Sequence, residues 1–179
     1  MAVAVATVAA GPNTASAAEG NWHTIVNGYS GQCVIVGEPG NGAPVVQVPC
    51  NELRTGSKSW NFVPTKDNKG ARAYFIRNET TDKCMGVSSS LDSGPVVIQY
   101  TCNGSVDQKW WVPSNSLIRN VYSGKCLGVG SSKAVAKRLI QWPCNSSSID
   151  QLWATPSPFY DGAPFEGEAP SIPSLPLPE

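Results

Sequence analysis

The feature of this sequence that most constrains the fold is a segment that occurs three times. The copies begin at residues 25–33, 76–84 and 118–126, and each starts Ile-x-Asn with a cysteine eight residues after the isoleucine. Each copy then passes through a Gly-rich or Ser-rich turn into an apolar stretch that ends at a second cysteine followed by asparagine. A tryptophan closes each unit, at Trp60, Trp110 and Trp153. Such self-similarity predicts equivalent structural units that pack on one another.

Within each unit the pattern is that of β-strands. The apolar stretches at 44–50, 95–102 and 139–144 are short, rich in Val and Ile, and bounded by Gly, Ser, Asn and Pro. Gly and Pro together make up 32 of 179 residues and charged residues only 15%, which favours a turn-rich β architecture. Residues 133–139, the segment closest to a helical pattern, are interpreted as a loop that leads into a strand. Each unit therefore predicts about four short strands.

One such unit cannot bury an apolar face alone, but three units around a pseudo-threefold axis share a core. Trp60, Trp110 and Trp153 are predicted to fill the shared centre, one indole per repeat. The units differ in length, since 24 residues separate Trp60 from Cys84 and 16 separate Trp110 from Cys126. The extra residues fall at 65–72, a polar segment with a glycine, which predicts a surface hairpin loop.

The six cysteines are compatible with disulfides or with zinc, but no C-x-x-C pair is present for a zinc site. The pairs Cys33–Cys50, Cys84–Cys102 and Cys126–Cys144 have near-equal spacings of 17, 18 and 18 residues. Equivalent positions in equivalent units should pair alike, which predicts one local disulfide per repeat. By closing a loop in the unfolded chain, each disulfide contributes roughly 3 kcal/mol to the free energy of unfolding in the chain-entropy description. Disulfides persist outside the cytosol, so we expect a secreted protein.

The repeat resembles that of the ricin-type β-trefoil lectins, in which each unit ends in Gln-x-Trp. Residues 108–110 and 151–153 match this motif, and residues 58–60, Lys-Ser-Trp, are a degenerate copy. The resemblance covers about residues 22–154. It implies an all-β fold, a β-trefoil of about twelve strands. It also implies non-covalent binding of carbohydrate, often galactose or N-acetylgalactosamine, with up to one shallow pocket per repeat.

The family pocket uses an Asp two residues after the first cysteine, an aromatic residue two before the second cysteine, and Asn or Asp before the Gln. A carboxylate accepts hydrogen bonds from sugar hydroxyls, and the ring packs on the apolar face of the sugar. At these three positions the first repeat has Ile35, Val48 and Ser57, the second has Gly86, Tyr100 and Asp107, and the third has Gly128, Trp142 and Asp150. The first repeat is therefore expected to be inactive.

The second repeat keeps Tyr100, Asp107 and Gln108 as candidates, and the third keeps Trp142, Asp150 and Gln151 and is the best candidate. An aspartate at position 128 is expected to strengthen binding if the backbone leaves room for its side chain. Two alternative interpretations stay open. Gln108 and Gln151 can brace the backbone instead of contacting sugar, and Tyr100 and Trp142 can be packed surface aromatics.

Other functional classes are disfavoured. A formal net charge of zero argues against nucleic acid as a partner. With one histidine, His23, and no nucleophile motif, we expect no catalytic activity, no metal and no cofactor. No segment is apolar enough to predict a membrane span. Residues 1–17 read as a signal peptide with the small-x-small site 15–17, the alternative being a disordered Ala-rich end.

The predicted domain spans residues 20–154, with repeats at about 22–64, 73–114 and 115–154. Residues 155–179 form a different segment with seven prolines, four acids and no base. This tail predicts either a disordered end or a peptide that docks on a partner protein or on the trefoil itself. The expected function is that of a secreted, non-catalytic lectin that binds weakly, mainly through its third repeat. The alternative is an adaptor or subunit of a secreted complex or toxin, with decayed sugar sites.

Overall fold

The structure of the chain, a computed structural model, describes residues 22–52 and 58–155, and these residues form strands and two short 3-10 helices. The predicted signal peptide, Ser57 and all of the tail beyond Thr155 lie outside this range. The first repeat contributes β1 (Trp22–Thr24), β2 (Val26–Asn27), β3 (Cys33–Val36), β4 (Val45–Val48) and β5 (Ser59–Lys66). The second contributes β6 (Arg72–Asn78), β7 (Lys83–Gly86), β8 (Ile98–Thr101), η1 (Val106–Gln108) and β9 (Lys109–Trp111). The third contributes β10 (Arg119–Asn120), β11 (Cys126–Gly128), β12 (Ile140–Trp142), η2 (Ile149–Gln151) and β13 (Trp153–Ala154).

The described residues form thirteen strands where twelve were predicted, because the first strand is interrupted at Ile25. β1 pairs with β5, whereas β2 pairs with β13 and β3, so the chain changes partners at this residue. Counted as one strand, β1 and β2 leave four strands per repeat, as predicted. Residues 133–139 contain no helix, which also agrees with the prediction.

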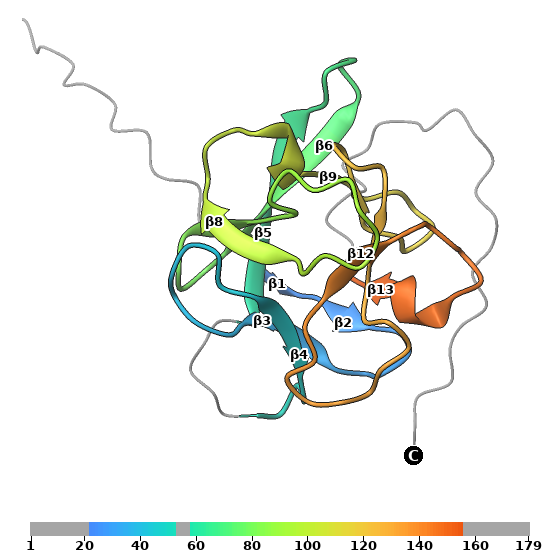
Figure 1. Cartoon of the computed structure of the whole chain (residues 1–179). Coiled ribbons are helices and arrows are strands. Elements are labelled where there is room, and N and C mark those ends of the chain that lie inside the picture. Colours follow the sequence, from blue (N-terminus) through green and yellow to red (C-terminus); the bar gives the residue numbers. More distant parts are fainter. Residues whose placement is uncertain (1–21, 53–57, 156–179) are drawn as a thin grey trace, which may run out of the picture.

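The strands close into a barrel. One sheet has the order β1-β5-β6-β9-β10-β11-β12, and the other has the order β13-β2-β3-β4. The continuous chain from β1 to β2 joins the two sheets on one side. On the other side a bridge pairs Leu117 with Leu152, and the N–H of Trp153 donates to the carbonyl of Ser116 at 2.9 Å. In Figure 1 the three thirds of the chain occupy three sectors around a common centre.

The core repeats three times. Trp60, Trp110 and Trp153 are all at most 2% exposed. Each donates its indole N–H to the carbonyl of the residue after the first cysteine of its repeat, at 2.9 to 3.0 Å; the acceptors are Val34, Met85 and Leu127. Each indole therefore buries a large apolar surface and also satisfies its polar atom.

The hairpins β3–β4, β7–β8 and β11–β12 meet at the pseudo-threefold axis through a ring of backbone hydrogen bonds. The N–H of Val45 donates to the carbonyl of Val97, that of Val97 to Leu139, and that of Leu139 to Val45, all at 2.9 Å. All three residues are fully buried. This cyclic pairing, together with the closed barrel, makes the chain an all-β β-trefoil.

A second cyclic set of hydrogen bonds joins side chains to the neighbouring repeat. Gln47, Gln99 and Gln141 are fully buried at equivalent positions, three residues before the second cysteine of each repeat. Each side-chain amide donates to two carbonyls of a loop in another repeat: Ser132 and Ala134, Glu38 and Gly40, and Ser90 and Asp92, respectively. Each glutamine also accepts a hydroxyl hydrogen bond, from Ser30, Thr81 and Ser123. Sequence analysis did not single out these glutamines.

The three predicted disulfides are confirmed. Cys33 pairs with Cys50, Cys84 with Cys102 and Cys126 with Cys144, with Cα–Cα distances of 5.0, 5.0 and 4.9 Å. Each bridge ties the first strand of a hairpin to the end of its second strand. The described cysteines include no free thiol.

The predicted extra hairpin is the outer part of β5–β6, which pair from Trp60–Asn78 to Lys66–Arg72 and project at the top of Figure 1. Asp67 closes the turn, accepting from the N–H groups of Lys69 and Ala71 at 2.8 Å and from the indole of Trp111 at 3.0 Å. Desolvation opposes ionisation of this carboxyl, but the hydrogen bonds outweigh it and lower the pKa of Asp67. The stabilisation that the ionised Asp67 carboxylate gives this turn is therefore present at neutral pH and is lost as the pH falls through the folded pKa.

Replacing Gln141 with Glu tests the bridges between repeats. The substitution keeps the side-chain volume but removes the two donors that hold Ser90 and Asp92, and it buries a carboxylate against their carbonyls. We expect Gln141→Glu to lower the free energy of unfolding by about 3 kcal/mol in urea denaturation. Asn68→Asp, which adds the same charge at an exposed turn residue, is the control and should change it by less than about 0.5 kcal/mol. Equal effects of the two variants would contradict the proposed role of the bridge.

Candidate functional site

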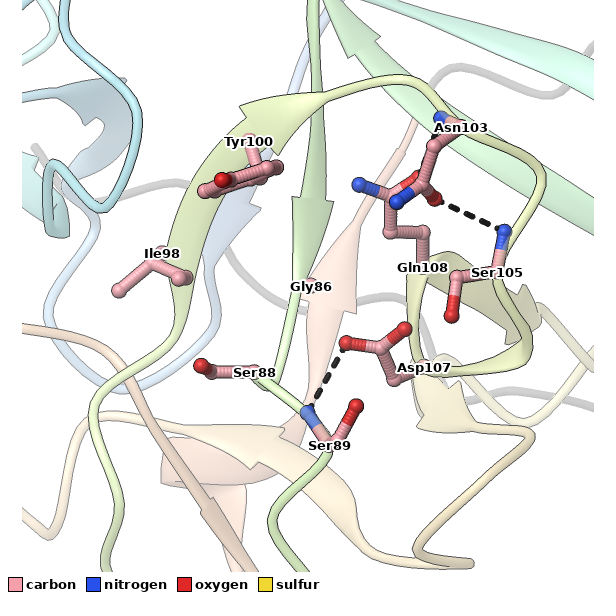
Figure 2. A pocket seen from close by; sticks show the side chains of 9 residues that line it. All are labelled: Gly86, Ser88, Ser89, Ile98, Tyr100, Asn103, Ser105, Asp107 and Gln108. Atoms are coloured by element: carbon pink, nitrogen blue, oxygen red, sulfur yellow. Dashed lines mark hydrogen bonds between the residues drawn. The ribbon is translucent and has the colours of Figure 1, made fainter.

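A pocket of about 290 Å³ lies in the second repeat, and its lining includes Gly86, Tyr100 and Asp107, which stand at the positions that the resemblance implies for sugar (Figure 2). Strand β7 ends in its floor at Gly86. Strand β8 brings Ile98 and Tyr100 to the same side, because alternate residues of a strand share a face. The remaining lining residues come from the loops before and after these strands and from η1; they are Ser88, Ser89, Asn103, Ser105, Asp107 and Gln108.

Tyr100 and Asp107 supply the two chemical features of this pocket. The Tyr100 side chain is 45% exposed, so its ring is available to a ligand. Asp107 is buried, and its Oδ2 accepts a hydrogen bond from the N–H of Ser89 at 2.9 Å. Its Oδ1 accepts none from the residues that the structure describes. The pocket therefore offers an aromatic surface beside a fixed carboxylate with one oxygen left for a hydroxyl group.

Gln108 and Gln151 lie beside these features, but their amides are engaged with the backbone. Gln108 donates to the carbonyl of Thr101 at 2.9 Å and accepts from the N–H of Asn103 at 3.1 Å. Gln151 donates to the carbonyl of Pro143 at 3.0 Å and accepts from the N–H of Asn145 at 2.9 Å. Both glutamines therefore brace the loop after the second cysteine, which is the alternative interpretation that the sequence left open.

The third repeat has the same arrangement with a larger aromatic side chain. Trp142, at the end of β12, is 49% exposed. Asp150, in η2, is half-buried, and its Oδ2 accepts from the N–H of Ser131 at 3.0 Å. Because Asp150 is more exposed than Asp107, its carboxylate is the more accessible of the two.

The first repeat lacks this arrangement. Ile35, Val46 and Val48 are buried and form a small apolar cluster of their own. Lys58, at the Gln position, donates instead to the carbonyls of Cys50 and Glu52. Apolar side chains thus occupy two of the three family positions, and the third, Ser57, lies outside the described residues.

Gly86 and Gly128 lie close to the side chains of the bracing glutamines, Gln108 and Gln151. A Cβ at Gly86 would stand 3.2 Å from Cγ of Gln108, and a Cβ at Gly128 would stand 3.2 Å from Cγ of Gln151 and 3.6 Å from Oδ2 of Asp150. The room required for an aspartate at position 128 is therefore tight. Such a side chain would crowd the brace and bring a second carboxylate close to Asp150.

The two acids, Asp107 and Asp150, are each also held by the following repeat. The Asn120 side chain, in the third repeat, donates to the carbonyl of Asp107 at 2.8 Å, and the Asn27 side chain, in the first, donates to the carbonyl of Asp150 at 2.9 Å. Sequence analysis noted these asparagines in the Ile-x-Asn motif but gave them no role. Because an asparagine recurs at this position in each repeat, the sequence alone could have indicated a structural role for it.

The described part of the chain has no group of three or more His, Cys, Asp or Glu side chains suited to a metal ion. None of its helices has the length and apolar character needed to cross a membrane. The lining of the pocket itself offers hydrogen-bonding groups, an aromatic ring and a carboxylate.

Comparison with known proteins identifies the class. Residues 21–153 match the model of the ricin-type beta-trefoil lectin domain, so the chain belongs to that family of carbohydrate-binding modules. A search of the curated proteins found no match.

Similar solved structures include the designed threefold symmetric protein ThreeFoil, with TM-score 0.66 and 23% identity over 75% of this chain and 96% of that one. The Polyporus squamosus lectin, bound to Neu5Aca2-6Galb1-4GlcNAc, has TM-score 0.65 and 17% identity, covering 78% of this chain and 50% of that one. The Abrus precatorius agglutinin has TM-score 0.62 and 24% identity, covering 80% and 51%. The present chain thus matches about half the length of each of these two natural proteins.

The close approach of Gln108 to Gly86 gives a testable expectation. Gly86→Ala should force the brace to shift and lower the free energy of unfolding by about 1–2 kcal/mol, as overpacking does in other buried sites. Gly40→Ala is the matched control, because a Cβ there meets nothing within 4 Å and should change stability by less than about 0.5 kcal/mol. Urea denaturation measures both variants. A neutral Gly86→Ala would show that the pocket floor has space for a side chain.

Proposed function

We propose that this protein is a secreted, non-catalytic lectin that binds galactose-type or N-acetylgalactosamine-type sugars weakly, mainly through its third repeat. The observation that carries the proposal is that the exposed Trp142 ring and the half-buried Asp150 stand at the positions equivalent to Tyr100 and Asp107, which line the pocket of the second repeat. A sugar offers an apolar C–H face to the ring and hydroxyl donors to the carboxylate, so the two features match the two sides of one ligand. Membership of the family supports carbohydrate as the ligand class.

The affinity of each site should be low. The family position that usually supplies a carboxylate holds Gly128 in the third repeat and Gly86 in the second. A hydrogen bond to a charged group is worth roughly 1.5–3 kcal/mol, and each pocket lacks this one. We therefore expect dissociation constants of about 1 mM, a binding free energy of about −4 kcal/mol.

Replacing the exposed aromatics tests where the sugar binds. Trp142→Ala should remove most of the binding to galactose or N-acetylgalactosamine, and Tyr100→Ala should remove the smaller part, since each removes the surface on which the ring packs. A loss of about 1.4 kcal/mol of binding free energy lowers the affinity tenfold, and binding that starts near about 1 mM then becomes too weak to detect. Calorimetric titration measures the effect, after a glycan array has identified the tightest sugar.

Tyr122→Ala is the control for these variants, because Tyr122 is also exposed but does not line the described pocket. It should bind sugar as the wild type does. If Trp142→Ala and Tyr100→Ala retain full binding, the proposed sites are wrong.

A second candidate function is that of an adaptor in a secreted complex or toxin, contacting a partner protein through the trefoil surface and the tail. It is favoured by the apolar cluster of Ile35, Val46 and Val48, which fills one sugar position, and by the two missing carboxylates. The glycan array separates the candidates. An adaptor ignores every sugar, whereas the lectin binds at least one.

The proposed location rests on the three disulfides and on the signal-like N-terminus, whose residues lie outside the described range. Expression with export should yield a mature chain that begins at or near Ala18, which N-terminal sequencing of the secreted protein can determine. A secreted chain that retains residues 1–17 would contradict the assignment of a signal peptide.

A further inference from the structure

The outer end of the β5–β6 hairpin has no part in the candidate sugar sites. β9 pairs with β6 at Tyr74 and Phe75, and the hairpin continues beyond them to its turn. Lys66, Lys69 and Arg72 are all exposed there. These residues belong to the extra segment that lengthens the connection from the first to the second repeat.

The adjoining barrel wall adds two more cations and two aromatic rings. Arg119 lies over the Trp111 ring at 5.3 Å, and Lys109 lies over the Phe75 ring at 5.9 Å. Lys109 also donates to the carbonyl of Lys66 at 3.0 Å, and Trp111 holds the turn through Asp67.

We call this surface the basic hairpin face; it comprises Lys66, Lys69, Arg72, Phe75, Lys109, Trp111 and Arg119. Residues 64–75 together with Lys109 and Arg119 carry five cations and one acid, Asp67. The Asp67 carboxylate already accepts three hydrogen bonds. The face is therefore a positive surface with half-exposed aromatic rings, which suits an acidic segment that also has apolar or proline residues.

The register of the strands shows that β13 runs toward this end of the barrel. β13 is antiparallel to β2, with Ala154 opposite Val26, and β1 is antiparallel to β5, with Trp22 opposite Asn61. Since β1 and β2 follow one another along the chain, β13 runs in the same direction as β5. The last described strand therefore ends at the side of the barrel at which β5 enters the hairpin.

Residues 156–179 have the complementary chemistry. They contain Asp161, Glu166 and Glu168 within 13 residues of Thr155, a further acid at 179, no base, and seven prolines. Phe159, Tyr160 and Phe165 lie among the acids. In an extended, Pro-rich conformation of about 3.1 Å per residue, the stretch from Thr155 to Glu168 reaches about 40 Å, enough to follow the hairpin.

We propose that residues 159–168 of this chain bind the basic hairpin face of the same molecule. The acids face the cations of the hairpin, and the prolines and aromatics contact Phe75 and Trp111. The tail is joined to the barrel by a few residues, which raises its local concentration at this face and favours it over a segment of a separate molecule. The inference is independent of sugar binding.

Nuclear magnetic resonance of the full chain tests the proposal. We expect the {1H}–15N heteronuclear NOE of residues 159–168 to be high at about 20 mM NaCl and to fall by about half at about 500 mM, where screening is strong. The variant K69E/R72E should show the low value at both salt concentrations. The variant K137E/R138E makes the same charge change at exposed residues of a third-repeat loop and should behave as the wild type does.

Two results distinguish other occupants. If the NOE of the tail changes over a roughly tenfold range of protein concentration, the tail binds a second copy and the proposal fails. Heparin should bind the hairpin several-fold more tightly in D161N/E166Q/E168Q, in which the tail no longer competes. Equal heparin affinity in this variant and the wild type, or equal tail NOE in K69E/R72E and the wild type, would show that the face is free and would overturn the proposal.

Discussion

Three backbone hydrogen bonds at the pseudo-threefold axis hold the rest of this structure in place. Val45, Val97 and Leu139 form a closed ring, in which each residue donates to one repeat and accepts from the other. The groups are fully buried, so a peptide N–H or carbonyl without its partner there would be costly. No single repeat can satisfy its own member of the ring, so each hairpin depends on the other two for the partners of its buried backbone groups. The glutamine bridges extend the same dependence outward to the loops.

This arrangement explains how the sites are built. The wall of the second pocket includes Ser89, next to the Ser90 carbonyl that Gln141 of the third repeat holds. The acid of that pocket is positioned by Asn120, also of the third repeat. In the same way Gln47 and Asn27 of the first repeat hold the loop and acid of the third. Each pocket is thus formed by one repeat and positioned by the next.

The framework and the sites use different residues, so they can vary separately. The bridging glutamine, the Ile-x-Asn asparagine, the cysteine pair and the closing tryptophan occur in all three repeats. The pocket positions differ: Val48, Tyr100 and Trp142 occupy the aromatic position in turn. The first repeat therefore keeps its fold while Ile35, Val46 and Val48 form an apolar cluster, at the positions that the pocket residues Gly86, Ile98 and Tyr100 hold in the second repeat.

Much of the fold was predictable from the sequence because it follows from local repetition. Near-equal cysteine spacings predicted the bridges, and the longer interval between Trp60 and Cys84 predicted the extended hairpin. Gln47, Gln99 and Gln141 were overlooked because they stand within apolar stretches, where pattern reading attends to the hydrophobic residues. The bonds of Asp107 to Ser89 and of Asp150 to Ser131 could not be predicted, because they depend on how loops distant in sequence meet. The tightness around Gly128 likewise follows from the path of Gln151, which the sequence does not reveal.

In the proposed function, two of the three repeats retain a sugar site and the first does not. Titration of the 15N-labelled protein with galactose and with N-acetylgalactosamine, followed by amide chemical shifts, tests it most directly. We expect saturable shifts around Ser131 and Trp142, smaller ones around Ser89 and Tyr100, and none around Ile35 and Val48. Shifts centred on Ile35 and Val48, or no saturable shifts with either sugar, would contradict it.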